Sequence, residues 1–194
     1  MTKGPLFIVS GASGSGKTTV IDRLLAEMPP GRVRLSVSAT TRQPRAGEID
    51  GKHYYFWSRE RFEEGIDRQE FLEHAEVHGH YYGTLRGEVE PYCGRGMGVI
   101  LDIDVQGAAQ IRRLYPDAVT IFLRTSSTAA YEKRLRERGT ETEGAIRRRL
   151  ATAARELDHA GEYDHQVVND DLDSAVAQLG DIVKRHLERG NHAG

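Results

Sequence analysis

Short runs of apolar residues alternate along the chain with longer segments whose apolar residues recur at helical spacing. Continuous apolar runs are typical of strands buried inside a parallel sheet, and they occur at Leu6–Val9, Gly98–Asp102, Ala118–Leu123 and Gln166–Val168. Helical spacing is found in Lys17–Met28, Asp104–Leu114 and Leu172–Arg189. Strands that alternate with helices predict an α/β fold in three layers, a parallel sheet with helices on both faces.

Two segments break this rhythm. From about Ser38 to Arg86 the chain is rich in aromatic residues and glycine turns, which predicts a β-rich insertion. Strands are expected at 33–38, 54–57, 71–77 and 80–82. From about Thr125 to Gly161 two charged helices are expected, at about 128–138 and 143–160, as a second mobile piece. We therefore divide the chain into a core (1–37, 87–124 and 162–194), an insertion (38–86) and a lid (125–161).

The charge balance excludes several classes of protein. The 194 residues carry 27 Lys and Arg against 29 Asp and Glu, a net charge of −2, so bulk attraction to nucleic acid or an anionic membrane is not expected. The single cysteine, Cys93, permits neither an intrachain disulfide nor a cysteine zinc site, which suits the reducing cytoplasm. The first apolar run is too short for a signal peptide, and no run is long enough for a membrane span.

The segment GASGSGKT lies directly after a predicted strand and before a predicted helix, and it fits the phosphate-loop pattern G-x-x-x-x-G-K-[ST]. Glycines let successive backbone N–H groups face one centre, and the helix N-terminus adds partial positive charge. Lys17 can reach the β- and γ-phosphates, and Thr18 can bind Mg²⁺. The predicted ATP-binding residues here are Gly11, Ala12, Ser13, Gly14, Ser15, Gly16, Lys17 and Thr18.

Asp102 and Asp104 lie at the end of the strand Gly98–Asp102 and are candidates for the acidic partner of the phosphate loop. We expect Asp102 to act near the metal, directly or through a water, or near the incoming nucleophile. Asp104 has the alternative of being only a helix cap.

A carboxylate is expected on the apolar side of the strand 71–77. Strand alternation places Phe71, Glu73, Ala75 and Val77 on one side, apolar except for Glu73. A buried carboxylate needs an internal partner or a ligand, and periodicity alone does not choose between the two. The histidines at 74, 78 and 80 share the other face with Glu76, which favours a solvated polar face over a zinc site.

The segment SATTRQPRAGEIDGKHYYF concentrates Arg42, Arg45 and Lys52 in a loop punctuated by proline and glycine, within a slightly acidic chain. Arginine presents a planar fork that matches phosphate oxygens, and tyrosine hydroxyls add uncharged donors. The loop therefore predicts a local anion site. The alternative is that the arginines pair with Glu48 and Asp50 across the loop.

With these motifs assembled, the chain resembles the guanylate kinase family, whose members convert GMP and ATP to GDP and ADP. The likeness runs from Leu6 to about Arg189 and is most specific in GASGSGKT, SVSATTRQPRAGEIDGKHYYF, EFLEHAEVHGHYYGT, ILDIDVQG, RGTE and VVND. The family fold is a five-stranded parallel core with a GMP-binding insertion and a lid. Ala12 and Thr84 depart from the proline and serine of many relatives, which bears on affinity more than on the reaction.

The resemblance implies the roles of individual residues. GMP would be held by Ser38, Arg42, Arg45, Tyr54, Glu73, Tyr82, Thr84 and Asp104. Arg42, Arg45, Tyr54 and Tyr82 would contact its phosphate and the other four its guanine. Lys17, Arg42, Asp102, Arg138 and Arg149 would serve catalysis, with Arg134 on adenine and Asn169 at its edge. The alternative for the lid arginines is a solvated face that pairs with Glu137, Glu141 and Glu143.

The implied partners are ATP, GMP and dGMP, with Mg²⁺ as cofactor, in purine nucleotide metabolism; monomer and homo-oligomer both stay open. One rival is a kinase for another small phosphate, such as a ribose bisphosphate, which would have no need for Glu73. Another is a scaffold domain that binds phosphopeptides, but such domains tend to have lost the lysine that stands here as Lys17.

Overall fold

The structure is a computed structural model that describes residues 3–12, 14–77, 79–137 and 143–192. Its centre is a parallel sheet in the order β2-β7-β1-β8-β9, which confirms the predicted α/β class. These strands are β1 (Leu6–Gly11), β2 (Val33–Leu35), β7 (Gly98–Asp102), β8 (Val119–Arg124) and β9 (His165–Val168). Of the described residues, none belongs to a helix long and apolar enough to cross a membrane.

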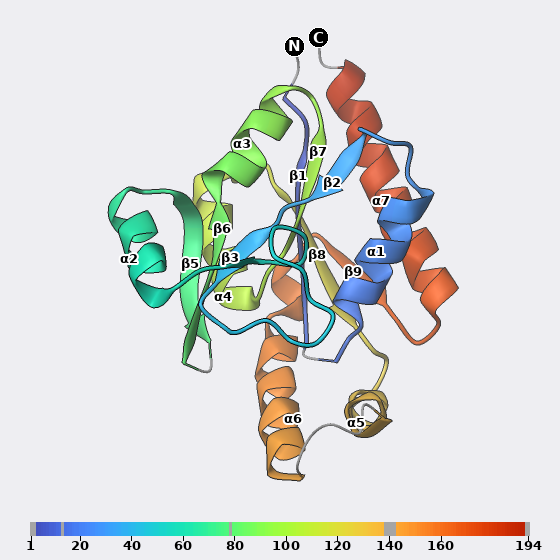
Figure 1. Cartoon of the computed structure of the whole chain (residues 1–194). Coiled ribbons are helices and arrows are strands. Elements are labelled where there is room, and N and C mark those ends of the chain that lie inside the picture. The colour runs from blue at the N-terminus through green and yellow to red at the C-terminus, as the bar shows by residue number, and fades with distance from the viewer. Residues whose placement is uncertain (1–2, 13, 78, 138–142, 193–194) are drawn as a thin grey trace.

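Helices cover both faces of this sheet (Figure 1). On one face α1 (Lys17–Glu27) and α7 (Leu172–His192) pack on Phe7 and Val9 through Val20, Leu24 and Leu179. On the other, α3 (Arg86–Gly94) and α4 (Val105–Leu114) pack on Ile8 and Leu101. Because all five strands are parallel, their carboxyl ends meet at one edge, where ligands bind in open α/β sheets.

A second sheet, in the order β4-β3-β6-β5, forms most of the insertion. Its strands are β3 (Ser38–Thr40), β4 (Tyr55–Phe56), β5 (Phe71–Val77) and β6 (His80–Leu85). Helix α2 (Arg59–Asp67) covers one face through Phe62, which stacks on Phe71 and Tyr81.

The single strand predicted at 33–38 is wrong. The Ser36 N–H still donates to the Ile100 carbonyl, but the chain then leaves the core sheet and starts β3 in the second sheet. Helices α2 and α3 were also not predicted. Each buries only two residues of its own, and α3 contains Pro91, so neither shows a clear helical pattern.

The alternation predicted for 71–77 is wrong at its start, because the pairing of β5 with β6 shifts register between Phe71 and Glu73. A bulge of this kind adds one residue and reverses the facing of those before it. Phe71 therefore lies on the same side as His74, with its ring 6.1 Å from that imidazole, while Leu72 packs into the core. The prediction that Glu73 is buried is confirmed, because only 5% of it is exposed.

Helices α5 (Thr128–Glu137) and α6 (Glu143–Asp158) lie at the carboxyl edge of the core sheet (Figure 1). The buried Tyr131 of α5 and Ala153 of α6 form an apolar cluster with Ala12 of the phosphate loop. Ala12, the departure from proline, therefore lies where the helical pair packs on the loop.

Candidate active site

The phosphate loop joins β1 to α1 and has the backbone that its glycines permit. Gly14 and Gly16 have positive φ angles of 93° and 87°, which favour glycine. A side chain at Gly16 would also stand 2.5 Å from Asn169 Nδ2. Lys17 Nζ donates to the Gly11 carbonyl at 2.9 Å, so the ammonium is folded back across the loop. Ser13 lies outside the described residues.

Asp102 ends β7 beside the phosphate loop. Thr18 Oγ1 donates to Asp102 Oδ2 at 3.3 Å, and Lys17 Nζ lies 4.0 Å from Oδ1. Burial raises the pKa of Asp102, and this rise is opposed by Lys17 and by the Thr18 hydrogen bond. A hydroxyl and a carboxylate side by side are oxygen donors of the kind that Mg²⁺ prefers.

A cleft of about 230 Å³ lies over the phosphate loop. It is lined by Gly14, Ser15, Gly16, Lys17, Thr18, Thr19, Tyr54, Asp102 and Arg149. Tyr54 comes from the insertion and Arg149 from α6, so all three parts of the chain meet there. Burial, helped by Asp102 and Tyr82, raises the pKa of Tyr54 to about 12. Its hydroxyl is therefore protonated at neutral pH and can donate a hydrogen bond.

Arg134 of α5 and Asn169, which follows β9, both bind the phosphate loop. Asn169 Nδ2 donates to the Ser15 carbonyl at 2.7 Å, and Arg134 Nη1 donates to the same oxygen at 3.3 Å. Arg134 Nη2 also donates to the Asn169 carbonyl at 2.6 Å. Both residues thus lie against the predicted ATP site, and their side-chain N–H groups donate to main-chain carbonyl oxygens.

A polar row crosses the insertion sheet. Ser38 on β3 pairs with Thr84 on β6, and Thr84 pairs with Glu73 on β5. Thr84 Oγ1 donates to Glu73 Oε1 at 2.6 Å within the protein interior. Burial raises the pKa of Glu73 to about 7, with the Thr84 bond opposing the rise and Asp104 adding to it.

Glu73 faces the N-terminus of α4. A Cβ added at Gly107 would lie 2.7 Å from Glu73 Oε2, so only glycine leaves room for the carboxylate. Asp104 caps the same helix by accepting from the Gly107 N–H at 2.8 Å. The expected cap is therefore confirmed, and the helix N-terminus contributes partial positive charge beside two carboxylates.

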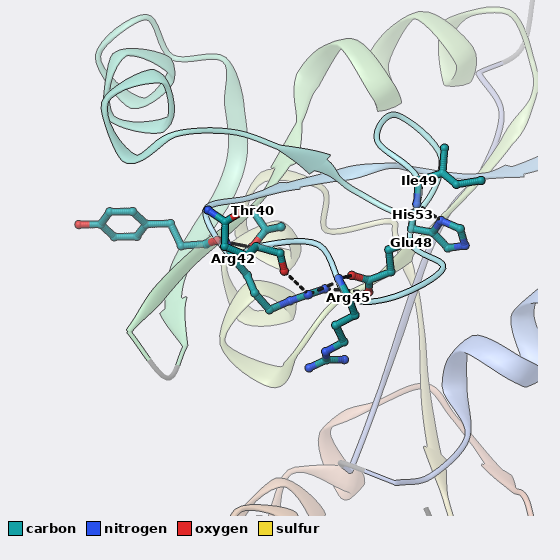
Figure 2. Close-up of polar contacts among 8 residues, drawn as sticks. Thr40, Arg42, Arg45, Glu48, Ile49 and His53 are labelled. Carbon is teal, nitrogen blue, oxygen red and sulfur yellow. Dashed lines mark hydrogen bonds and ion pairs between the residues drawn. The ribbon is translucent and has the colours of Figure 1, made fainter. Parts of the chain in front are cut away.

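The arginine loop has the internal ion pair that was the alternative for Arg42. Its guanidinium binds Glu48 through two hydrogen bonds of 3.0 and 2.8 Å (Figure 2). The guanidinium carbon of Arg42 also lies 5.6 Å from the centre of the Tyr54 ring, which packs edge-on against Tyr82. Asp50 instead accepts from the Phe56 N–H, and among the described ion pairs none involves Arg45.

Comparison with known proteins agrees with these features. The family model for guanylate kinase matches residues 3–186. The chain belongs to the guanylate kinase family. A guanylate kinase of Escherichia coli strain K12 is 47% identical over 184 residues, which cover 95% of this chain and 89% of that protein. One of Salmonella typhi is 46% identical over the same length and coverage.

A solved structure also resembles this guanylate kinase family member along nearly its whole length. The crystal structure of guanylate kinase from Anaplasma phagocytophilum has a TM-score of 0.79 and 32% identity, and the match covers 96% of this chain and 87% of that one. The five-stranded core sheet and the order of its elements are thus those of a guanylate kinase.

Most of the predicted side chains gather in two places. Lys17, Thr18, Asp102, Tyr54 and Arg149 share the cleft, and Ser38, Thr84 and Asp104 lie around the buried carboxylate of Glu73. Arg138 lies outside the described residues, as does Glu141. Glu143 pairs with Arg136 rather than with a predicted site arginine. His74 is exposed, and no metal-binding cluster of three or more residues occurs among those described.

Sequence reasoning missed the contact of Arg134 and Asn169 with the Ser15 carbonyl. Nothing in the sequence pattern relates residues more than a hundred positions apart. It also treated Glu48 only as a competing partner for arginine, and not as a group that holds two segments of the loop together. The Glu48 N–H closes a turn onto the Arg45 carbonyl at 3.0 Å, a contact that the P-R-A-G-E spacing could have suggested.

Proposed function

We propose that this protein transfers the γ-phosphoryl group of ATP to GMP, which yields ADP and GDP. The observation that carries the proposal is the buried Glu73 in a polar row beside an arginine loop, on a core with a phosphate loop. Guanine presents N1–H and N2–H side by side, and an ionised carboxylate can accept both hydrogens. Adenine has an acceptor at N1 and no N2 amino group, so the carboxylate would keep its bond from Thr84 but would receive no N–H from these two positions of the base.

The donor side would be held by the phosphate loop. Backbone N–H groups of Gly11 to Thr18 and the Lys17 ammonium would bind the phosphates of ATP, with Arg134 and Asn169 on the side of the adenine. Thr18 and Asp102 would hold Mg²⁺, Asp102 directly or through water, and the ion would neutralise charge on the phosphates. Two protein oxygen groups suit Mg²⁺, which usually keeps several waters and substrate oxygens.

The acceptor phosphate would lie between the arginine loop and the cleft. Arg42, Arg45, Tyr54 and Tyr82 would hold it by hydrogen bonds and charge. Tyr54 supports this placement, because it touches both the arginine loop and the cleft over the phosphate loop. The acceptor oxygen would then face the γ-phosphorus in line, and Arg149 with Arg138 would stabilise the transferring group.

The three parts of the chain would divide the work. Residues 1–37, 87–124 and 162–194 would hold ATP, the insertion 38–86 would hold GMP, and the lid 125–161 would close over both. Closure serves phosphoryl transfer because water in the site would take the phosphoryl group instead. We include dGMP as an acceptor because the assigned residues address the base and the phosphate. We place the reaction in the cytoplasm, which suits the free, buried thiol of Cys93.

A coupled assay of ADP release tests the proposal. The purified protein would be given ATP and Mg²⁺ with GMP, dGMP, AMP, UMP or a ribose phosphate in parallel. We expect fast release with GMP and dGMP and at least a hundredfold lower kcat/KM with the others. Equal rates with AMP would contradict guanine recognition, and a preference for a ribose phosphate would assign the protein to another kinase.

A further inference from the structure

Glu48 joins two arginine-bearing parts of the same loop. Its Oε1 accepts from Arg42 Nη2 at 2.8 Å, and its Oε2 accepts from Arg42 Nη1 at 3.0 Å and from the Arg45 backbone N–H at 2.6 Å (Figure 2). The side chains of Arg42 and Glu48 are 12% and 18% exposed, so the pair is largely shielded from water. The hydrogen bonds from Arg42 lower the pKa of Glu48, which keeps its carboxylate ionised at neutral pH.

Glu48 binds one edge of the Arg42 guanidinium, and the other edge does not contact Glu48. A guanidinium has five N–H donors, and two of its forks can each bind an anion. The fork formed by Nη1 and Nη2 holds Glu48, and Nη1 also donates to the Gln43 carbonyl at 2.7 Å. The geometric hydrogen bonds of the described residues use Nη1 and Nη2 of Arg42 but not Nε, and the Tyr82 hydroxyl lies close enough to the guanidinium to help raise the pKa of Arg42. Nε and the second Nη2 hydrogen form the other fork.

Further contacts fix the loop around this carboxylate. The Arg42 N–H donates to Thr40 Oγ1, and Thr40 Oγ1 donates to the Tyr81 carbonyl of β6. The side chain of Arg45 extends away from the Glu48 carboxylate, although its backbone is bound to it (Figure 2). The Glu48 carboxylate thus binds the Nη1 and Nη2 end of the Arg42 guanidinium and the main-chain N–H of Arg45.

We propose that Glu48 is a positioning residue of the acceptor site: it holds Arg42 by one fork so that the Nε fork meets the phosphate, and it fixes Arg45 to address the same phosphate. The inference rests on the proposed function, because it takes the phosphate to be that of GMP. Competition between Glu48 and the phosphate is disfavoured. If the phosphate displaced Glu48 from Arg42, the shielded Glu48 carboxylate would lose both Arg42 donors. Of its described donors only the Arg45 N–H would remain.

The test compares binding of GMP with binding of guanosine, which lacks the phosphate. Glu48→Gln keeps the size of the side chain but places an NH₂ group against an Arg42 donor. We expect the Kd for GMP, measured by titration calorimetry, to rise on the order of tenfold, since a charged hydrogen bond is lost. We expect the Kd for guanosine to change less than about twofold, because the base row is unaltered.

Two further variants complete the experiment. Glu48→Asp keeps the charge but is one methylene too short to reach both Arg42 and the Arg45 N–H, so it should also weaken GMP more than guanosine. Glu63→Gln is the matched control. Glu63 belongs to the same insertion and pairs with Arg59 at 2.9 Å, but both side chains are more than half exposed. This control should bind both ligands as wild type does.

Each outcome decides the proposal. Weaker GMP binding with unchanged guanosine binding supports it. Tighter GMP binding by Glu48→Gln would show that Glu48 competes with the phosphate, and unchanged binding would show that it has no part in the site. Equal weakening of GMP and guanosine would assign Glu48 to folding of the loop. If wild type itself fails to bind GMP, the proposed function is overturned and this inference with it.

Discussion

Replacement of the buried carboxylate at Glu73 has a calculable effect on base choice. One oxygen of Glu73 accepts from Thr84 at 2.6 Å, and the other faces the space beside Gly107. Glu73→Gln keeps the volume but turns one of these acceptors into an NH₂ donor. If the amide oxygen stays with Thr84, the NH₂ faces the guanine N–H groups; if the amide turns, the NH₂ faces the Thr84 hydroxyl.

The cost follows from this mismatch. A lost hydrogen bond to a charged group removes about 1.5–3 kcal/mol, and an unpaired buried donor costs about 1–3 kcal/mol more. Together these predict a loss of roughly 10²- to 10⁴-fold in kcat/KM for GMP. The kcat/KM for AMP should change far less, because adenine cannot use the two acceptors in wild type.

The assay is ADP release with GMP or AMP as acceptor, measured for wild type, Glu73→Gln and the control Glu76→Gln. Glu76 is on the same strand but exposed, so its variant should behave as wild type. Xanthosine monophosphate is a useful third acceptor, because it keeps N1–H without the N2 amino group. A Glu73→Gln enzyme that keeps the wild-type preference for GMP would refute the assignment of Glu73 as the guanine reader.

Two other predictions concern protonation and the phosphate loop. Because the pKa of Glu73 is raised to about 7 and guanine pairs with the ionised form, guanosine affinity should rise with pH up to about 7 and level off above about 8. The contribution of Glu73 to the stability of the free protein should fall as pH rises from about 4.5 to 7, since the folded state binds this proton more tightly than the unfolded state. Calorimetry of wild type checks the direction of both pH trends, and Glu73→Gln is the control because it has no carboxylate at this position to titrate. A wild-type affinity for guanosine that does not change with pH would contradict the first prediction. Lys17→Ala should abolish turnover while GMP binding survives, because Lys17 lies on the donor side; loss of GMP binding in that variant would mean that the two sites are not separate.

The core could be predicted from sequence because its signals are local. The run Leu6–Val9, the glycine loop and the helix from Lys17 follow one another, and each element is specified by its own residues. Glu73 could also be predicted as buried, although the facing of Phe71 could not. A bulge arises from the pairing of two strands, and the sequence of one strand does not contain that information.

The site was harder to predict where it depends on contacts distant in sequence. Ser38, Thr84 and Glu73 form a row only because three strands pair in one register. The bond from Asn169 to the Ser15 carbonyl joins residues from opposite ends of the chain, and no periodicity reveals it. Glu48 is difficult for a different reason. The sequence shows which residues of a loop are charged, but it does not show which edge of the Arg42 guanidinium binds the Glu48 carboxylate.

The most direct test of the central claim is to identify the products. Wild-type protein would be incubated with ATP, Mg²⁺ and either GMP or AMP, and the nucleotides would be separated by ion-exchange chromatography. The account predicts GDP and ADP in equal amounts from GMP, with little conversion of AMP. ADP formed without GDP would show that water takes the phosphoryl group, and conversion of AMP as fast as GMP would show that the buried carboxylate does not select guanine.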